Sequence, residues 1–430
     1  MRVLVVGGGG REHALCWALQ RDAPDATLFA APGNPGTATL GTNLQVQAVD
    51  VEKVVEAVEA HHIDLTIVGP EAPLALGLAD RLRERGRPVF GPSQAAARLE
   101  SSKAYAKEVM RRARVPTAAS GAFAELGPAL DYIRAHREPL VVKASGLAAG
   151  KGVVVCDTRA AAEAAARTML AGGALGEAGR EIVVEEFLEG EELSVLALTD
   201  GDRIVILPPA QDHKRLGEGD TGPNTGGMGA YCPVSLATPS LLARVRREVL
   251  EPVLREMAAQ GAPYEGVLYA GLIVARDGTP YVLEFNCRFG DPEAQVILPG
   301  LAPGVSRTFV DIATRRWRPS SDVLAPARAA VTTVLAARGY PDHPEQGVPI
   351  DLPRPAELGD DVLVFHAGTT LGPDGVLRTA GGRVFSVTGL AATVPDAARG
   401  ARAASERIAF EGKTWRRDIA WREIGRAGAA

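Results

Sequence analysis

The sequence predicts an α/β protein in three parts: an N-terminal domain with a doubly wound parallel sheet, a larger central region, and a small mixed α/β domain. Three observations lead to this prediction. Short apolar runs alternate with helical patterns over the first hundred residues, as parallel strands joined by crossover helices do. From residue 140 onward, strand-like runs are separated by glycine-rich loops. The chain of 430 residues also exceeds the roughly 250–300 residues that one hydrophobic core supports.

The elements of the N-terminal domain follow from its apolar runs and their breakers. The runs that end at a glycine or proline are read as strands, at residues 2–6, 27–31, 65–68 and 88–90. The segments between them have helical periodicity, at residues 11–21, 51–60 and 74–85. Ser101 and Ser102 begin the next helix, which runs to about residue 113, because serine is a favourable N-cap.

The central region is richer in strands. Strand patterns occur at residues 140–143, 152–156, 182–187, 193–199 and 203–207, with a helix expected at residues 158–170. A long loop of glycine and proline follows at 208–233, and the longest helix is expected at 238–259. Two further strands, 266–275 and 281–286, flank an Asp277-Gly278 turn and are read as a hairpin.

A linker rich in proline, residues 319–326, precedes the last part of the chain. Strand-like runs follow at 329–336, 362–365 and 383–388, and a helix is expected at 396–411. These patterns predict a small mixed α/β domain at this end of the chain.

Composition excludes several classes of protein. The 46% hydrophobic and 23% charged residues are ordinary for a globular protein, and the net charge of −5 argues against a general nucleic-acid binder. Four cysteines lie far apart, which suggests neither a zinc site nor disulfides. No stretch approaches the roughly 20 apolar residues of a membrane helix, and the N-terminus lacks a signal pattern. We therefore expect a cytoplasmic enzyme with reduced thiols and no membrane or nucleic-acid partner.

A glycine-rich loop, GGGGREHA at residues 7–14, follows the first strand and opens a helix. Such loops let backbone N–H groups approach a phosphate at the positive helix end. A nicotinamide-binding site would place an acidic residue at the end of the second strand, but that strand runs into Pro32 without one. The loop is therefore expected to hold a different phosphate, such as that of a sugar phosphate. A tight turn that binds nothing is the alternative.

Two further loops could bind a nucleotide. Residues 143–155, KASGLAAGKGVVV, place glycines and lysines between two strands, so the loop could close over a triphosphate while its lysines neutralise charge. It is not a P-loop, because Val153 follows Gly152 and no helix begins there. Residues 185–194, EEFLEGEELS, place carboxylates at a strand exit, where they could bind an adenine amino group and ribose hydroxyls. A flexible hairpin and a solvated acidic turn are the alternatives.

The strongest local pattern is EFNCRFGDPEAQ at residues 284–295. Residues two apart on a strand share a face, which places Glu284, Asn286 and Arg288 on one face and apolar residues on the other. A carboxylate beside an amide oxygen suits magnesium. Arg288 could hold a carboxylate through two parallel hydrogen bonds. A buried ion-pair network is the alternative interpretation.

The loop at residues 211–231 contains QDHKR and DTGPNTGGMGAY. Long irregular loops so dense in charged residues and glycine are more often functional than filler. The sequence has neither Ser-His-Asp spacing nor a cysteine paired with histidine. We therefore expect no covalent enzyme nucleophile.

In this order, these segments resemble the phosphoribosylamine–glycine ligase family, also called glycinamide ribonucleotide synthetases. The resemblance also includes GPEAPL at 69–74 and FHAGT at 365–369, and it spans nearly the whole chain. The family often has asparagine where this chain has Gly8. The resemblance implies a central ATP-grasp fold of two α+β lobes. The expected domains are 1–100, 101–318 with a mobile nucleotide lid at about 118–190, and 326–430.

The resemblance also implies roles for individual residues. The reaction would join glycine to 5-phosphoribosylamine with ATP and Mg²⁺ or Mn²⁺, through glycyl phosphate, in purine biosynthesis. Arg288, Asp212 and Lys143 would be catalytic, and Glu284 and Asn286 would hold the metal. ATP would contact Lys103, Lys143, Gly150, Lys151, Gly152, Glu185, Leu188 and Glu192. The other substrates would contact Gly9, Gly10, Arg11, Glu71, Asp212, Lys214, Gly227, Arg288 and Asp291.

Three alternatives remain open at this point. Another ATP-grasp ligase, such as a carboxylase acting on aminoimidazole ribonucleotide, would use bicarbonate in place of glycine. A nicotinamide-dependent oxidoreductase would use the first loop, although the strand-end acid is missing. A silent ligand-binding or scaffold protein would show no glycine-dependent turnover. The sequence leaves the oligomeric state open, with a monomer among the options.

Overall fold

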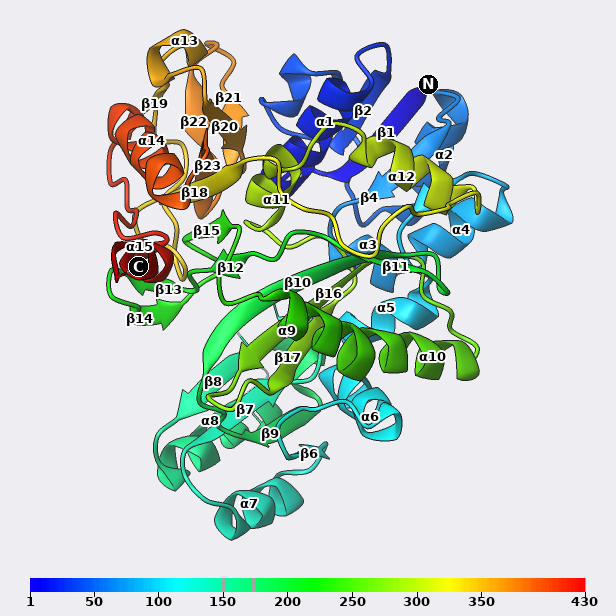
Figure 1. The fold of residues 1–430 in the computed structure, drawn as a ribbon, viewed down its shortest axis with the longest axis vertical. Helices are drawn as coiled ribbons and strands as arrows, with labels where there is room; N and C mark the ends of the chain where they lie inside the picture. The colour runs from blue at the N-terminus through cyan, green and yellow to red at the C-terminus, as the bar shows by residue number, and fades with distance from the viewer. Residues whose placement is uncertain (149–151, 172–174, 430) are drawn as a thin grey trace.

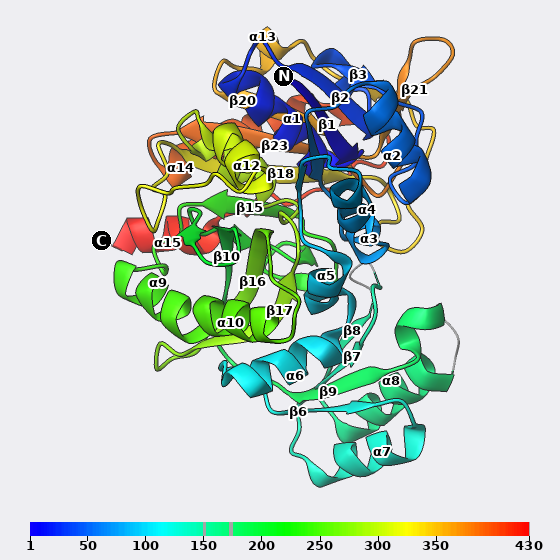
Figure 2. The same cartoon turned by 90° about the vertical axis from the view of Figure 1, so that its right-hand side faces the viewer.

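The computed structural model describes residues 1–148, 152–171 and 175–429. Figure 1 shows the N-terminal segment, in blue, and the C-terminal segment, in orange and red, at one end of the molecule. The central sheet lies below both of them. At the other end is a smaller body, here called the outer lobe, formed by the described residues between 120 and 186. Figure 2 shows the outer lobe extending away from the rest of the molecule.

The N-terminal segment forms the predicted parallel sheet. Its strands lie in the order β3-β2-β1-β4-β5, and every neighbouring pair is parallel. They are β1 (Arg2–Gly7), β2 (Thr27–Pro32), β3 (Thr42–Asn43), β4 (Leu65–Val68) and β5 (Val89–Phe90). The strand order reverses between β1 and β4, where open α/β sheets bind ligands beyond the carboxyl ends of their strands. The glycine-rich loop and Glu71 follow these two strands directly.

The helices of this segment confirm most of the predicted pattern. They are α1 (Gly10–Asp22), α2 (Val51–Ala60), α3 (Glu71–Ala75), α4 (Leu78–Glu84), α5 (Gln94–Ser101) and α6 (Lys103–Ala113). The single helix predicted at 74–85 is wrong. Gly77 has a φ of +84° in the left-handed region, so it ends α3 and begins α4. Ser102 caps α6 as predicted, but α5 was not predicted.

The central sheet has the order β11-β10-β16-β17 and is antiparallel. Its strands are β10 (Glu191–Thr199), β11 (Ile204–Ile206), β16 (Gly266–Val274) and β17 (Pro280–Asn286). The predicted long helix is divided into α9 (Pro239–Val245), a π-helical turn (Arg246–Leu250) and α10 (Glu251–Ala259). Pro252 lacks the N–H that would bond the carbonyl of residue 248, which accounts for the widened turn.

The outer lobe has its own sheet and its own core. The sheet order is β6-β9-β7-β8, from β6 (Ser120–Phe123), β7 (Leu140–Ala144), β8 (Val153–Cys156) and β9 (Ile182–Glu186). The helices α7 (Leu126–Ala135) and α8 (Arg159–Ala171) contact this sheet. Residues such as Ile133, Val142 and Ile182 form a hydrophobic cluster separate from the two large clusters of the body. The lobe is therefore packed as a distinct unit.

The C-terminal segment adds three strands to a sheet that begins in the central region. The order is β12-β15-β18-β23-β20, from β12 (Gln211–Asp212), β15 (Gly229–Cys232), β18 (Ala329–Ala336), β20 (Val362–His366) and β23 (Arg383–Ala391). The irregular loop predicted at 208–233 instead contains β12, β13 (Arg215–Gly217), β14 (Thr221–Asn224) and β15. The strand β15 pairs with the distant strand β18, and local sequence patterns do not reveal such a pairing.

Among the described residues, the remaining elements of the C-terminal segment are three helices and four short strands. The helix α14 (Val394–Arg407) covers the C-terminal sheet, and α13 (Pro355–Leu358) and α15 (Trp421–Ala429) lie nearby. Two small ribbons pair β19 (Ile350–Asp351) with β24 (Ala409–Phe410) and β21 (Thr369–Leu371) with β22 (Leu377–Thr379).

Within the described ranges no single helix is long and apolar enough to cross a membrane. Only α11 (Ala294–Gly300) and α12 (Val305–Ala313), bent by 109°, pass that test as a pair, by length and composition alone.

A buried histidine joins the N-terminal and C-terminal segments. The backbone N–H of His366 on β20 donates to His13 Nδ1 on α1 at 2.9 Å, and Asn34 donates to the carbonyl of His366 at 2.9 Å. The joint has no spare room, because a Cβ on Gly36 would lie 2.2 Å from the His13 ring. Burial, and then the neighbouring His366, lower the pKa of His13 to about 3. His13 is therefore neutral in the folded protein at ordinary pH.

We predict that His13→Asn makes stability less dependent on pH. In the wild type, unfolded His13 takes up a proton near pH 6.5, whereas the folded residue does so only near pH 3. The stability that this difference supplies is present above pH 6.5 and is lost as the pH falls, by about 2 kcal/mol at pH 5. Asparagine can still accept the His366 N–H but does not titrate. Urea unfolding gives the free energy of unfolding at pH 7 and at pH 5. The decrease between the two pH values should be about 2 kcal/mol smaller for the variant than for the wild type, and an equal decrease in both proteins would contradict the prediction.

Candidate active site

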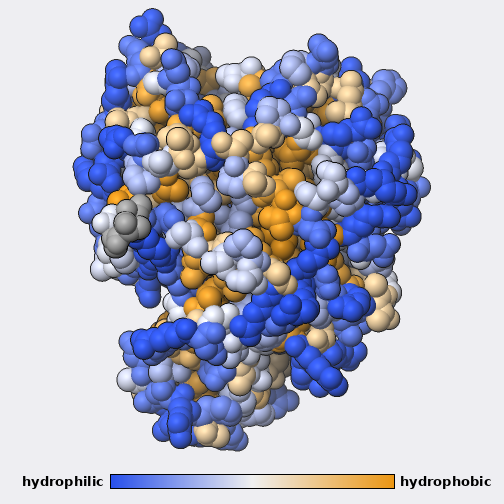
Figure 3. Space-filling model, in the orientation of Figure 1, coloured by the Kyte–Doolittle hydropathy of each residue, from blue (hydrophilic) through white to orange (hydrophobic). Residues whose placement is uncertain are grey.

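A cleft of about 1320 Å³ lies between the outer lobe, the central sheet and the N-terminal segment. Figure 3 shows the outline of the molecule indented where the outer lobe joins the body. The cleft brings together fourteen of the predicted site residues from segments far apart in the sequence. They are Arg11, Glu71, Lys103, Lys143, Gly152, Glu185, Leu188, Glu192, Asp212, Lys214, Glu284, Asn286, Arg288 and Asp291.

Five predicted residues are not part of this lining. Gly150 and Lys151 lie outside the described residues. Gly9, Gly10 and Gly227 are described but are not among the residues that line the cleft, and their roles remain predictions. Gly9 is already engaged, because its N–H donates to Glu12 Oε2 at 2.6 Å. Protein atoms therefore occupy part of the helix end that the sequence predicts as a phosphate site.

The strand β17 presents the strongest predicted motif to the cleft. Glu284 lies opposite Gly271 of β16, and Asn286 lies opposite Tyr269. A Cβ on Gly271 would approach the Glu284 side chain to 3.3 Å, so glycine leaves room for this carboxylate. Burial opposes ionisation of Glu284, but Lys214, Lys143 and Lys103 outweigh it, and its pKa lies below the ordinary value. Glu284 is therefore an ionised carboxylate surrounded by cations.

Glu284 and Asn286 fit a divalent cation through their oxygen atoms. Within the described ranges, no group of three or more His, Cys, Asp or Glu side chains could hold a metal. The protein therefore offers one carboxylate and one amide oxygen at this point. Mg²⁺ is often held by one or two protein oxygens together with substrate phosphates and water, so the donor set suits a metal that arrives with a phosphorylated ligand.

Arg288 is held by two carboxylates from the N-terminal segment. Its Nη2 donates to Glu100 Oε1 at 2.6 Å, and its Nε donates to Glu71 Oε2 at 3.2 Å. It also donates to Asn286 Oδ1 and to the carbonyl of Phe289, each at 3.2 Å. Most of its five N–H groups thus already have protein acceptors. A carboxylate ligand that bound Arg288 through two hydrogen bonds would have to displace one of these, and Glu71 is the more exposed of the two acids.

Lysines gather at the mouth of the outer lobe. Glu185 pairs with Lys143 at 2.9 Å and with Lys107 at 3.2 Å, and all three side chains are largely buried. Lys103, one helical turn before Lys107 on α6, donates to the carbonyl of Gly146 at 3.3 Å. Burial lowers the pKa of both Lys103 and Lys107. Glu185 therefore neutralises the charges of Lys143 and Lys107 in this structure, whether or not it also contacts a nucleotide.

A second group of charges surrounds Asp212 on β12. Lys214 pairs with Glu192 at 2.7 Å. Burial opposes the charge of Lys214, but Glu192 and then Glu284 outweigh it and raise its pKa. Burial, and then the neighbouring Glu293, raise the pKa of Asp212 well above its usual range. Among the described residues, Asp212 Oδ1 is buried without a hydrogen-bond partner. Because this oxygen is free to accept a hydrogen bond, Asp212 is a candidate proton acceptor.

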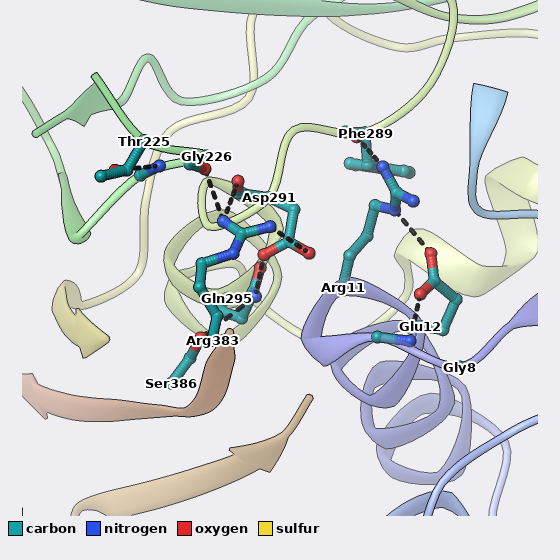
Figure 4. A network of polar contacts seen from close by, with 12 residues as sticks. Gly8, Arg11, Glu12, Thr225, Gly226, Phe289, Asp291, Gln295, Arg383 and Ser386 are labelled. Atoms are coloured by element: carbon teal, nitrogen blue, oxygen red, sulfur yellow. Dashed lines mark hydrogen bonds and ion pairs between the residues drawn. The ribbon is translucent and has the colours of Figure 1, made fainter. Parts of the chain in front are cut away.

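Arg11 and Asp291 lie at the end of the cleft beside α1. Arg11 donates to Glu12 Oε1 at 2.6 Å and to the carbonyl of Phe289 at 3.2 Å. Asp291 receives Gln295 Nε2 at 2.7 Å and pairs with Arg383 at 3.2 Å (Figure 4). Burial opposes ionisation of Asp291, but Arg383 and Arg11 outweigh it and lower its pKa. The arrangement gives polar groups of both signs, which suits a phosphorylated sugar.

Four residues of the site were missed by the sequence analysis. They are Lys107, Glu100, Glu293 and Arg383. Lys107 could have been found, because it is one of only seven lysines and lies four residues after Lys103 on the same helix. Glu293 lies within the motif at 284–295 but was given no role, because its partners Ser194 and Tyr269 are remote in sequence. Glu100 and Arg383 also gain their roles through remote partners, and no local pattern indicates them.

Comparison with known families gives matches along most of the chain. The Phosphoribosylglycinamide synthetase N domain matches residues 1–100, its ATP-grasp (A) domain matches 101–294, and its C domain matches 330–422. The phosphoribosylamine–glycine ligase of Vibrio parahaemolyticus is 46% identical over 436 residues, covering 99% of both chains. That of Allochromatium vinosum is 48% identical over 435 residues, again covering 99% of both chains.

Solved structures give a similar result. The crystal structure of phosphoribosylamine–glycine ligase from Thermotoga maritima has a TM-score of 0.86 and 37% identity, covering 97% of this chain and all of that one. A biotin carboxylase complex from Campylobacter jejuni has a TM-score of 0.75 at 15% identity, covering 96% of this chain and 92% of that one. The second match shows a shared fold alone.

We predict that Glu100→Ala destabilises the protein by about 3 kcal/mol, because it removes one partner of a buried ion pair. The variant leaves Arg288 with Glu71 as its one acidic partner among the described residues. It also removes the acceptor of the Cys287 N–H, which donates to Glu100 at 2.7 Å. Urea unfolding measures the change. Glu59→Ala is the control, because its pair with Arg85 lies on the surface and should contribute less than about 1 kcal/mol. Equal effects of the two substitutions would contradict the prediction.

Proposed function

The chain belongs to the phosphoribosylglycinamide synthetase family, and we propose that its cleft is where glycine is joined to 5-phosphoribosylamine. The protein is an ATP-dependent carbon–nitrogen ligase with an ATP-grasp domain, and its reaction yields glycinamide ribonucleotide in purine biosynthesis. The observation that carries the site assignment is that Glu284 and Asn286 on β17, and Arg288 just after it, line a cleft that also holds Lys103 and Lys143.

The domain limits that we propose are 1–100, 101–318 and 326–430, with residues 118–190 as the nucleotide lid. The separate core of the outer lobe supports the last assignment, because a lobe with its own packing can move as one body. The C-terminal domain shares a sheet with β12 and β15, so it is expected to stay fixed to the body.

ATP would lie between the outer lobe and the central sheet. Lys103 and Lys143 would neutralise its phosphates, and the backbone near Leu188 would meet the adenine. Glu185 would orient Lys143 and Lys107, which it already pairs with in this structure. Glu192 would meet the ribose, and Gly150, Lys151 and Gly152 would cover the phosphates. Exclusion of water by the lid matters, because an acyl phosphate hydrolyses readily.

Enzymes with an ATP-grasp domain use ATP with a divalent metal ion. We propose Mg²⁺, with Mn²⁺ as a substitute, because the donors of Glu284 and Asn286 are both hard oxygens. When bound there, the ion would neutralise charge on the transferring phosphoryl group. Glu284 would hold its charge in this role, since three lysines keep it ionised.

Glycine would bind beside Arg288. Its carboxylate would attack the γ-phosphate of ATP, giving ADP and glycyl phosphate. Arg288 would hold the carboxylate after releasing Glu71, and Glu100 would keep the guanidinium in place. The displaced Glu71 would then be free to meet a ribose hydroxyl of the second substrate. The protein supplies positioning and charge neutralisation for this step and no nucleophile of its own.

The amine of phosphoribosylamine would attack the glycyl carbonyl, and phosphate would leave. As the amide bond forms, the nitrogen must lose a proton, and Asp212 would accept it through the oxygen that has no hydrogen-bond partner among the described residues. Lys214 and Gly227 would line the same part of the site. Arg11, Gly9, Gly10 and Asp291 would receive the phosphoribosyl group beside α1. A carboxylase acting on aminoimidazole ribonucleotide would also bind a phosphoribosyl group, but its ADP release would not depend on glycine.

We predict that ADP release requires both glycine and phosphoribosylamine, and that Glu284→Gln lowers it by at least roughly 100-fold. Glutamine keeps the shape of the side chain but removes the charge that the metal needs. Phosphoribosylamine is made in situ from ribose 5-phosphate and ammonia, and the product is identified by mass. Glu411→Gln, a substitution at an exposed surface pair, should leave the rate unchanged. Near-normal turnover of Glu284→Gln would remove Glu284 from the metal role.

We predict that Asp212→Asn lowers kcat by roughly 100-fold or more, the usual effect of losing a general base. The apparent KM values for ATP and glycine should stay within about threefold, because Asp212 is expected to act on the amine. Asp202→Asn, at an exposed turn, is the control. Initial rates with each substrate varied in turn measure the effect, and an unchanged kcat would exclude Asp212 as the proton acceptor.

A further inference from the structure

The C-terminal domain reaches into the cleft through Arg383, the first residue of β23. Its Nη1 donates to the carbonyl of Asp291 at 2.7 Å and also to the carbonyl of Gly226, while Nη2 pairs with Asp291 Oδ2 at 3.2 Å. Figure 4 shows the guanidinium between these two loops. One side chain thus joins the segment that follows β17 to the loop between β14 and β15.

Gly226 is held a second time by the same domain. Its backbone N–H donates to the hydroxyl of Tyr340 at 2.9 Å. Both backbone polar groups of Gly226 are therefore bonded to side chains of the C-terminal domain. A Cβ on Gly382 would lie 2.3 Å from the Tyr340 ring, so glycine just before Arg383 lets the two side chains lie together.

The next residue, Gly227, lies directly against Asp212. Its φ of +108° lies in the region that favours glycine, and a Cβ there would fall 2.7 Å from Asp212 Oδ1 and 2.5 Å from Pro292. The backbone at 226–227 therefore forms one wall of the pocket around the Asp212 carboxylate. A shift of this backbone would change the direction in which Asp212 points.

The other loop held by Arg383 closes the same pocket from a second side. Asp291 has both carboxylate oxygens engaged, one by Gln295 and one by Arg383. Pro292 follows it and contacts the Gly227 side of the pocket, and Glu293 is held by Ser194 at 2.9 Å and Tyr269 at 2.8 Å. Two loops that flank Asp212 are thus fixed to each other through one guanidinium.

We propose that Arg383 and Tyr340 form a clamp on Gly226 that positions Asp212 for the amine of the second substrate. The clamp rests on the proposed function, since it serves the step in which phosphoribosylamine attacks the activated glycine. Arg383 and Tyr340 are positioning residues that act through the backbone at 226–227. The C-terminal domain therefore takes part in the amide-forming step, while the residues proposed to bind ATP and glycine belong to the other two domains.

The test compares Arg383→Gln, Arg383→Lys, Tyr340→Phe and the double variant Tyr340→Phe/Arg383→Gln with the wild type. Arg383→Gln should lower kcat/KM for phosphoribosylamine roughly 100-fold, as a small misplacement of a reacting group can. The KM values for ATP and glycine should stay within about twofold. Tyr340→Phe removes one hydrogen bond and should cost about 3- to 10-fold. Arg383→Lys keeps the charge and should recover part of the loss.

The double variant tests whether the two side chains act on one element. If both hold Gly226, their combined loss should be clearly smaller than the product of the single losses. Arg399→Gln is the matched control, because Arg399 makes an exposed pair with Asp396 on α14 of the same domain. It should leave all kinetic constants unchanged, and circular dichroism should show every variant folded.

Several results would overturn the proposal. An unchanged kcat/KM for phosphoribosylamine in Arg383→Gln would do so. So would equal losses for all three substrates, which indicate a general structural effect. Losses that multiply fully in the double variant would also overturn it, because they show that the two side chains act independently. A wild-type protein that releases no ADP with both co-substrates would instead overturn the proposed function itself, and this inference with it.

Discussion

The ion pair between Arg288 and Glu100 is the contact on which the rest of the site depends. It joins the end of β17 to the N-terminal domain, and Glu100 also accepts the N–H of Cys287, the residue after Asn286. Because a buried cation without a partner is costly, this pair fixes where the strand ends and how its polar face meets the cleft. The position of Asn286, and the direction of Arg288 toward its proposed glycine site, follow from that one anchor.

Much of the fold could be predicted from the sequence. The parallel N-terminal sheet, the β16–β17 hairpin and the N-cap at Ser102 follow from local patterns of apolar residues, turns and caps. The strands β12 and β15 could not be predicted, because β15 pairs with β18, about a hundred residues later, and β12 pairs with β15 at the edge of the same sheet. The break at Gly77 was missed because a single glycine inside a helical pattern can be tolerated or can end the helix.

The sequence predicted which residues belong to the site better than it predicted the partners of their charges. Glu284 and Asn286 could be placed on one face because strand periodicity is strict, whereas Arg288 reaches the same cleft from just beyond the end of β17. The surroundings of each charge depend on packing, so the sequence could not show that Arg288 has two acidic partners or that Glu185 pairs with two lysines. The glycine-rich loop illustrates the same limit, since the amide of Gly9 is bonded by Glu12 three residues later.

In the proposed mechanism, the carboxylate substrate in the cleft is activated by phosphoryl transfer. Transfer of oxygen from glycine to phosphate is the consequence that distinguishes this route from direct hydrolysis of ATP. The measurement uses glycine labelled with ¹⁸O in its carboxylate, with the released phosphate analysed by mass. One labelled oxygen should appear in each phosphate formed, because the glycyl carbon–oxygen bond breaks when the amine attacks. Phosphate that carries no label, while glycinamide ribonucleotide still forms, would contradict a glycyl phosphate intermediate.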